Sequence, residues 1–233
     1  MSWLNQNEFL FQESRVGVLV KNGKLKKSRY LANNYSNLLR VAILSRFGGT
    51  YLDTDIIVLR RLPDVKNVPN FVGRQDKNLI SKKLSQHKHV SVKHCKVKAN
   101  SCSDNAAMRF QRGHKILDDL QLYLSENFDG NIWGHNGPKA VTQTILKMCK
   151  NETFENVLVY PKEQFYSIPW EEYWKFFNVD YKKEILDKTK ESYGIHMWNA
   201  MNKLAKNVSY DYEKDSAFKV IALKYCPLTA INS

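Results

Sequence analysis

The stretch SNLLRVAILSRFGGTYLDTDIIVL, residues 36–59, decides the fold of this chain. Its first part continues a helical pattern that we predict over residues 34–47, with apolar side chains on one face. The pair Gly48-Gly49 ends that helix, since glycine lets the backbone reverse tightly. A short strand is then predicted to carry Asp53 and Asp55, followed by an apolar strand over residues 56–59. Because strand side chains alternate, both carboxylates are expected on one face.

The two carboxylates favour a metal site. A D-x-D sequence alone is more often a pair of solvated loop carboxylates. Here, however, apolar sequence lies on both sides of Asp53 and Asp55, where unpaired carboxylates are costly. Two converging carboxylates suit a hard divalent cation with oxygen ligands. If a diphosphate lies beyond that cation, the metal joins the carboxylates to phosphate oxygens.

Strand and helix patterns alternate along the rest of the chain, which indicates an α/β fold. An aromatic segment, residues 170–177, is expected to be a short helix or turn, either packed in the core or forming a sugar-stacking wall. A proline at the first helical position is favourable, so Gly137-Pro138 is expected to open a helix. The other predicted strands are residues 16–20, 70–73 and 157–160, and the other predicted helices are residues 113–128 and 217–225.

Five ordered blocks of sequence resemble one known family. They are RFGGTYLDTDIIVLRRL (residues 46–62), NIWGHNGP (131–138), FYSIPW (165–170), SYGIHMWN (192–199) and KYCP (224–227). Together they resemble the α-1,4-glycosyltransferase family (lactosylceramide 4-α-galactosyltransferase-like) from about residue 20 to 228. The lead-in KSRYL, residues 27–31, is most like the insect branch of that family.

The resemblance implies a GT-A-type, Rossmann-like glycosyltransferase domain, with its metal site at strand ends. Within one globular domain, residues 1–76 would form the nucleotide-sugar and metal-binding part, with the D-x-D motif. Residues 77–104 would be a basic insertion, and residues 105–233 the carboxyl-terminal glycosyltransferase part. Compared with the family pattern, we expect the first strands of the nucleotide-binding half to be missing.

The resemblance also implies the cofactor and its ligands. Asp53 and Asp55 would act in catalysis by holding Mn²⁺ or Mg²⁺, which neutralises the leaving diphosphate as a Lewis acid. Asp55 is expected to bind the metal directly, and Asp53 to contact the ribose or a metal-bound water. His196 is expected as a further metal ligand, although a histidine among apolar residues is as often a core residue.

Binding of the donor, a UDP-sugar, is expected from a second set of residues: Arg29, Asn37, Arg40, Asn105 and Gly137. Most relatives carry aspartate where this chain has Asn37, which retains an acceptor oxygen but not the charge. The loop from Trp133 to Pro138 would line the sugar and acceptor pocket, with His135 and Asn136 as catalytic residues. Its alternative role is that of a structural glycine-rich turn.

The implied activity is that of a retaining hexosyltransferase. It would move galactose or N-acetylgalactosamine from UDP-galactose or UDP-N-acetylgalactosamine to a glycosphingolipid, in α-1,4 linkage. The alternative is an inactive or truncated paralogue that binds glycan or a partner enzyme without catalysis. By the same resemblance, we expect the lumenal side of the Golgi membrane, with attachment to the membrane through an anchor that this chain lacks.

The net charge of +13 permits a third class, a nucleic-acid-binding protein. Seven lysines and no acid lie in residues 77–98, which favours nucleic acid or an anionic membrane, or else a solvated loop. No aromatic platform for RNA is visible, so we expect no nucleic-acid partner. Zinc is not expected either, because His87, His89, His94 and Cys95 match no closed site.

Cysteines and sequons permit a secretory setting without proving one. Four cysteines occur without a C-x-x-C spacing, and their pairing cannot be deduced from the sequence. Three N-x-S/T sequons occur, at Asn34, Asn151 and Asn207.

Overall fold

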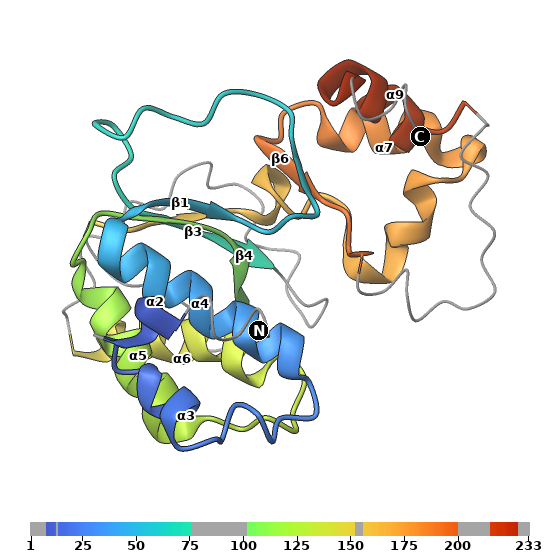
Figure 1. Ribbon diagram of the computed structural model, residues 1–233. Helices are drawn as coiled ribbons and strands as arrows, with labels where there is room; N and C mark the ends of the chain where they lie inside the picture. Colours follow the sequence, from blue (N-terminus) through green and yellow to red (C-terminus); the bar gives the residue numbers. More distant parts are fainter. Residues whose placement is uncertain (1–7, 13, 76–101, 152–155, 200–214, 228–233) are drawn as a thin grey trace. The chain divides into compact units, whose positions relative to one another are not determined.

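The computed structural model describes residues 8–12, 14–75, 102–151, 156–199 and 215–227 (Figure 1). The chain has the expected α/β character, with helices alternating with short strands. It divides into two compact units, and the predicted functional division into residues 1–76, 77–104 and 105–233 stays a prediction. Unit 1 comprises residues 1–51 and 64–160, and unit 2 comprises residues 52–63 and 161–233.

Unit 1 is built on a four-stranded sheet. Its strands lie in the order β1 (Gly49–Leu52), β4 (Cys102–Phe110), β3 (Phe71–Gln75) and β5 (Leu158–Tyr160). Strand β3 pairs antiparallel with β4 and parallel with β5, so the sheet is mixed. The strands expected at residues 70–73 and 157–160 correspond to β3 and β5.

The helices of unit 1 lie on one face of this sheet (Figure 1). The core between them contains fully buried side chains from both layers, including Leu38, Leu44, Val72, Met108 and Leu117. The helices are α2 (Glu8–Gln12), α3 (Gly17–Lys21), α4 (Leu31–Phe47), α5 (Lys115–Asn127) and α6 (Ala140–Lys150). A π-helical turn, η1 (His135–Lys139), contains Pro138 and leads directly into α6, so Pro138 lies two residues before the regular helix.

The strand predicted at residues 16–20 is wrong, because this segment forms helix α3. Its β-branched residues favour a strand by propensity, but packing decides otherwise. Val16 and Leu19 are fully buried while Val18 is half exposed, which is a helical spacing. A Cβ on Gly17 would lie 2.1 Å from the carbonyl oxygen of Phe11, so only glycine permits this close approach.

Unit 2 contains a two-stranded antiparallel sheet and its own core. Strand β2 (Ile56–Val58) pairs with β6 (Gly194–His196), with Ile56 opposite His196. Buried apolar side chains form the core: Ile168, Phe176, Phe177, Ile185, Ile195, Met197, Ala217 and Ile221. The helices are η2 (Lys162–Gln164), η3 (Trp170–Phe176), η4 (Val179–Tyr181), α7 (Lys182–Thr189) and α9 (Ala217–Tyr225).

The aromatic segment at residues 170–177 serves both the core and the surface. Phe176 and Phe177 are buried in the core of unit 2. Trp170 and Trp174 remain exposed, and Trp174 meets Tyr181 edge to face.

Part of the predicted basic insertion belongs to a strand. Residues 102–104, which the prediction placed in the insertion, begin strand β4, and Ser103 and Asp104 are buried there. The other residues of the insertion lie outside the described residues, and with them the three histidines and one cysteine considered for zinc.

Cys149 forms a disulfide bond, whereas Cys226 is a free cysteine. Among the described residues, no helix is long and apolar enough to cross a membrane.

Candidate metal centre

Asp53 and Asp55 lie in the turn that joins β1 to β2. The prediction that a strand carries them is therefore wrong, although both strands flank the pair. The turn is closed by a hydrogen bond from the backbone N–H of Ile56 to the carbonyl oxygen of Asp53, at 3.0 Å. Turn geometry, rather than strand alternation, gives the two carboxylates their common direction.

The glycine pair before the turn is required by its backbone. Gly48 and Gly49 have φ values of +67° and +100°. Residues that carry a Cβ rarely adopt this backbone conformation. A Cβ on Gly48 would also lie 2.6 Å from the backbone nitrogen of Arg112. Helix α4 therefore ends at Phe47 and the chain turns at once into β1, as the sequence predicts.

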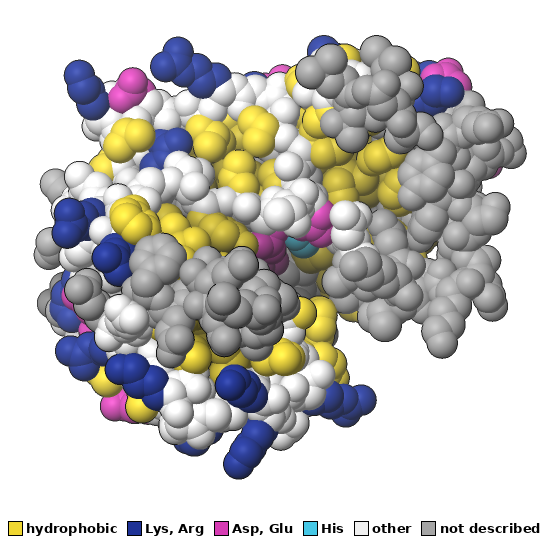
Figure 2. Space-filling view, in the orientation of Figure 1, with side chains coloured by type: hydrophobic (Ala, Val, Ile, Leu, Met, Phe, Trp, Pro, Cys, Tyr) yellow, Lys and Arg dark blue, Asp and Glu magenta, His cyan; other side chains and the backbone are white. Residues whose placement is uncertain are grey.

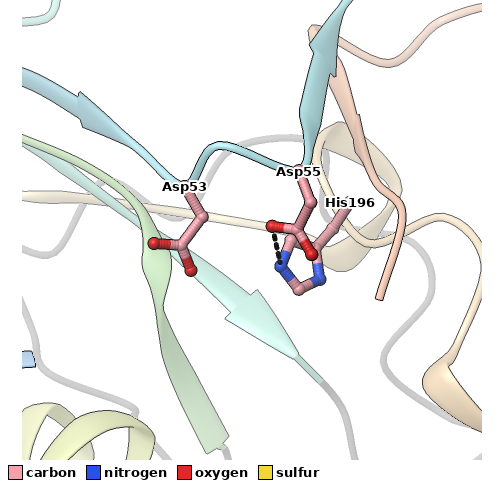
Figure 3. Close-up of side chains that lie close together, drawn as sticks. All are labelled: Asp53, Asp55 and His196. Atoms are coloured by element: carbon pink, nitrogen blue, oxygen red, sulfur yellow. Dashed lines mark ion pairs between the residues drawn. The ribbon is translucent and has the colours of Figure 1, made fainter. Parts of the chain in front are cut away.

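His196 joins the two carboxylates from a distant part of the sequence. It is the last residue of β6, and its position opposite Ile56 brings it beside the turn. The side chains of Asp53, Asp55 and His196 offer ligand atoms that all lie within 4.8 Å of one another (Figure 3). His196 Nε2 lies 3.2 Å from Asp55 Oδ1, and the two side chains are 10% and 16% exposed.

Asp55 is fixed by contacts at its side chain and its backbone. Its Oδ2 accepts a hydrogen bond from the backbone N–H of Asn199 at 3.0 Å, and its carbonyl oxygen accepts one from Met197 at 2.9 Å. Burial raises the pKa of Asp55, but the hydrogen bond and charge of His196, with the N–H of Asn199, outweigh it. The pKa therefore lies below its ordinary value of 3.8. Asp55 is thus an ionised carboxylate at neutral pH.

Two aromatic side chains hold the imidazole ring of His196. The ring of Trp198 meets it edge on at a centroid distance of 4.1 Å, and that of Tyr166 lies at 5.7 Å. Trp198 is held by a hydrogen bond from its Nε1 to the carbonyl oxygen of Ile168 at 2.9 Å. Its backbone has φ of +55°, which is rare for a tryptophan and costs of order 1–3 kcal/mol. Nothing in the sequence pattern indicated this role, although Trp198 lies in the SYGIHMWN block.

This donor set fits a divalent cation. Two carboxylates and one imidazole suit Mn²⁺ and related ions, while carboxylate oxygen also suits Mg²⁺. His196 is buried, whereas Asp53 and Asp55 are partly buried, and Asp55 and His196 are fixed by their neighbours. The three predicted metal ligands are thus brought together within unit 2.

The residues predicted to bind the donor form a separate polar cluster in unit 1. Asn105 Nδ2 donates to Asn37 Oδ1 at 2.8 Å, and Arg40 Nη1 donates to the carbonyl oxygen of Asn105 at 2.7 Å. A Cβ on Gly137 would lie 2.9 Å from Asn37 Oδ1, so Gly137 closes tightly over this pair. The structure thus brings four of these residues together and buries them. Arg29 lies outside the cluster, exposed, with its guanidinium 5.4 Å from the centre of the Tyr30 ring.

Asn136 and His135, predicted as catalytic, make contacts within unit 1. Asn136 is buried, and its amide donates to Asn34 Oδ1 at 2.9 Å and to the carbonyl oxygen of Asp129. His135 Nε2 lies 2.8 Å from the carbonyl oxygen of Asn127, at the end of α5. Both contacts hold the loop between α5 and α6, and the catalytic role of the two residues stays a prediction.

Comparison with known proteins identifies the family. The family model "Alpha 1,4-glycosyltransferase conserved region" matches residues 109–232. A second, "Glycosyltransferase sugar-binding region containing DXD motif", matches residues 3–92 and includes the Asp53–Asp55 turn. No solved structure gave a significant match.

Curated relatives of known name cover most of the chain. The lactosylceramide 4-alpha-galactosyltransferase of Pongo pygmaeus is 27% identical over 206 residues, 86% of this chain and 81% of the relative. The same enzyme of Mus musculus is 26% identical over 226 residues, 94% of this chain and 55% of the relative. The alpha-1,4-N-acetylglucosaminyltransferase of Homo sapiens is 25% identical over 202 residues, 83% and 50% respectively. The chain therefore spans about half the length of the mouse and human relatives.

An α/β fold, a D-x-D turn and a carboxylate–imidazole group define the class of metal-dependent glycosyltransferases. Since a family model matches more than half of its residues, the chain belongs to the α-1,4-glycosyltransferase family. This membership confirms the family and the class expected from the sequence.

Proposed function

We propose that the chain is a retaining hexosyltransferase that moves a sugar from a UDP donor to a glycosphingolipid in α-1,4 linkage. The observation that carries this proposal is the Asp53–Asp55–His196 group, formed in a chain that belongs to the α-1,4-glycosyltransferase family. Galactose or N-acetylgalactosamine is the proposed sugar. Relatives named as a galactosyltransferase and as an N-acetylglucosaminyltransferase support a hexose in general.

Asp55 and His196 would hold the metal, with Asp53 as a further ligand or as a contact to a metal-bound water or the ribose. A divalent metal held there neutralises charge on the diphosphate of the donor as it leaves. We favour Mn²⁺ over Mg²⁺, because an imidazole ligand suits a transition metal better than a strictly oxygen-seeking ion. The low pKa of Asp55 keeps its carboxylate charged for this role.

The polar cluster of Asn37, Arg40 and Asn105 is proposed to contribute to donor binding. Arg40 supplies a buried positive charge, and its guanidinium also lies 4.6 Å from the centre of the Tyr51 ring.

The test of the proposed activity is to assay the purified chain with Mn²⁺, a panel of UDP-sugars and glycolipid acceptors. The proposal requires release of UDP that depends on metal and acceptor, and an α-1,4-linked product by glycosidic-linkage analysis. Release of UDP that is independent of the acceptor or of the metal would refute it.

One observation favours a second candidate, a glycan-binding protein without catalysis. Asn37, where the family resemblance leads us to expect aspartate, is 3% exposed and engages its amide with Asn105 and Asn33. Asn37 is uncharged, and its amide is already hydrogen-bonded within the protein. It is therefore a weaker candidate for binding the hydroxyl groups of the donor sugar. Acceptor glycan binding without UDP-sugar turnover or hydrolysis in Mn²⁺ would support this candidate over the first.

We propose that the protein works on the lumenal side of the Golgi membrane. The disulfide of Cys149 supports an oxidising compartment, since such bonds are rare in the cytosol. Expressed with a secretory leader, the protein is expected to acquire glycans on accessible sequons, and a cytosolic location of the native protein would refute this proposal.

A further inference from the structure

A surface on unit 1 combines exposed basic and exposed apolar side chains. The turn between α3 and α4 presents four cationic residues, all exposed, and the loop after α5 presents Ile132 and Trp133, which are 50% and 48% exposed. We call this the basic–aromatic surface and define it by Lys24, Lys26, Lys27, Arg29, Ile132 and Trp133. Figure 2 shows several Lys and Arg side chains projecting beside hydrophobic ones in the lower part of the molecule, where Figure 1 places α3 and the turn after it.

The two segments of this surface are held together by direct contacts. Ser28 Oγ donates to the carbonyl oxygen of Gly130 at 2.9 Å. The rings of Tyr30 and Trp133 meet edge to face, with centroids 5.2 Å apart. A Cβ on Gly130 would lie 2.8 Å from Ser28, so the loop can approach the turn only because this residue is glycine. The cationic turn and the exposed indole therefore belong to one fixed surface.

The charge of this region is one-sided. Residues 15–52 contain eight lysines and arginines and no acidic residue. In the neighbouring loop, the carboxylate of Asp129 accepts a hydrogen bond from the backbone N–H of Asn131 at 2.8 Å. The basic turn thus presents a local excess of positive charge beside two large apolar side chains, with Asp129 as an acidic residue of the neighbouring loop.

We propose that the basic–aromatic surface docks on a lipid bilayer whose facing leaflet carries negatively charged headgroups. On the lumenal side these are acidic glycolipids, and phosphatidylserine is the probe for negative headgroup charge in the test below. A tryptophan with an adjacent isoleucine suits the region between headgroups and acyl chains, where amphipathic indole rings are enriched. Each lysine near such a surface strengthens binding by about fivefold through attraction to lipid phosphates. Single-stranded nucleic acid would need successive aromatic platforms, and the surface offers one exposed indole next to an aliphatic residue.

The test is sedimentation of the 233-residue chain with vesicles of phosphatidylcholine, with and without phosphatidylserine. We expect binding to the anionic vesicles that weakens steeply with salt. Lys26→Glu/Lys27→Glu should lower the partition coefficient at least about tenfold. The matched control, Lys147→Glu/Lys150→Glu, makes the same change in net charge at exposed positions on α6 and should lower it much less. Circular dichroism of each variant excludes unfolding. Lys26→Gln/Lys27→Gln removes the two charges without reversing them and is the substitute if the glutamate pair unfolds.

Trp133 provides the second measurement. Its fluorescence should be quenched by brominated lipid, and Trp133→Phe should remove most of this quenching. The proposal fails if Lys147→Glu/Lys150→Glu weakens binding as much as Lys26→Glu/Lys27→Glu does. It also fails if the chain does not bind anionic vesicles. It also fails if polyphosphate or RNA competes fully while Trp133 remains unquenched, since that would be general attraction to polyanions. A response of Trp133 to soluble acceptor sugar alone would assign the surface to glycan binding instead. None of these measurements needs a metal or a donor, so their outcome is independent of the proposed transferase activity.

Discussion

Replacing Asp55 by asparagine tests the metal centre most directly. The two side chains have nearly the same shape, and the amide oxygen can still accept the hydrogen bond from Asn199. What is lost is the negative charge that lies 3.2 Å from His196 and faces the proposed metal. The change therefore separates the electrostatic role of the residue from its packing.

The expected loss of metal affinity follows from that charge. A unit charge and a divalent cation about 4 Å apart interact by roughly 8 kcal/mol at an effective dielectric constant of about 20. The retained amide oxygen and the competition of water reduce this, so we expect a loss of about 2–4 kcal/mol. At about 1.4 kcal/mol per decade, Mn²⁺ should bind roughly 30- to 700-fold more weakly. Stability should fall less, because asparagine keeps one of the two side-chain hydrogen bonds.

Calorimetric titration of the purified chain with Mn²⁺ measures the affinity, and urea unfolding in EDTA measures the free energy of unfolding. The matched control is Asp187→Asn. This substitution removes an exposed carboxylate from the same unit. The ion pair of that carboxylate with Lys190 is long, at 4.0 Å. We expect the control to bind Mn²⁺ as the wild type does and to unfold at the same urea concentration. Turnover with UDP-sugar should follow the metal affinity in all three proteins.

Comparable Mn²⁺ affinity in Asp55→Asn and the wild type, within about threefold, would falsify the assignment of Asp55 as a charged metal ligand. A weaker affinity accompanied by an equal loss in the Asp187→Asn control would also count against it, since it would indicate a general effect of net charge. A loss explained entirely by unfolding of the variant would be visible in the urea curve, and His196→Gln then supplies the independent check.

Three further predictions concern stability and modification. Gly137→Ala should destabilise the fold by about 1–3 kcal/mol, because the new Cβ would meet Asn37 Oδ1 at 2.9 Å; an unchanged urea midpoint would contradict this. In EDTA, the charge of Asp55 should stabilise the wild type above its ordinary pKa of 3.8 and cease to do so as pH falls through the lower folded pKa. The stability difference between wild type and Asp55→Asn should therefore shrink below about pH 4, and a difference that grows there would refute the sign. In secreted protein, mass spectrometry should find no glycan at Asn34, which is 2% exposed, whereas Asn151 is exposed and accessible.

The longer helices could be predicted from sequence because their apolar periodicity agrees with their packing. Helix α4 ends at Phe47 as expected, since two glycines follow it, and it begins three residues earlier than the pattern indicated. Helix α9 has the expected bounds, and its N-terminal cap, Ser216, accepts a hydrogen bond from Lys219. Periodicity and end signals reinforced each other in both cases.

Short segments could not be predicted reliably, because their conformation depends on distant neighbours. Residues 16–20 form a helix since Val16 and Leu19 pack into the core of unit 1, against their β-branched propensity. The reason given for the common direction of the Asp53 and Asp55 carboxylates was wrong. The two residues lie in a turn between strands, not in a strand. The position of the pair after a Gly-Gly stop was nevertheless a correct signal.

The third residue of the proposed metal centre could not have been found from spacing alone. His196 is separated from Asp55 by about 140 residues, and only the pairing of β2 with β6 brings them together. The prediction came from resemblance to a family motif, and the geometry now supports it. Trp198, which fixes the imidazole ring, was missed because a strained tryptophan backbone leaves no mark on sequence pattern.

The proposed metal ligands and the proposed donor-binding residues belong to different units, and each set can be tested by its own measurement. Asp53, Asp55 and His196, with the aromatic residues around them, lie entirely in unit 2. The amide pair of Asn37 and Asn105 lies in unit 1 and is held by contacts within that unit. A substitution at Asn37 should therefore leave Mn²⁺ affinity unchanged even where it alters the choice of UDP-sugar. Residues that act on the metal and residues that act on the sugar can thus be assigned one at a time, by measuring Mn²⁺ affinity and donor preference on the same variants.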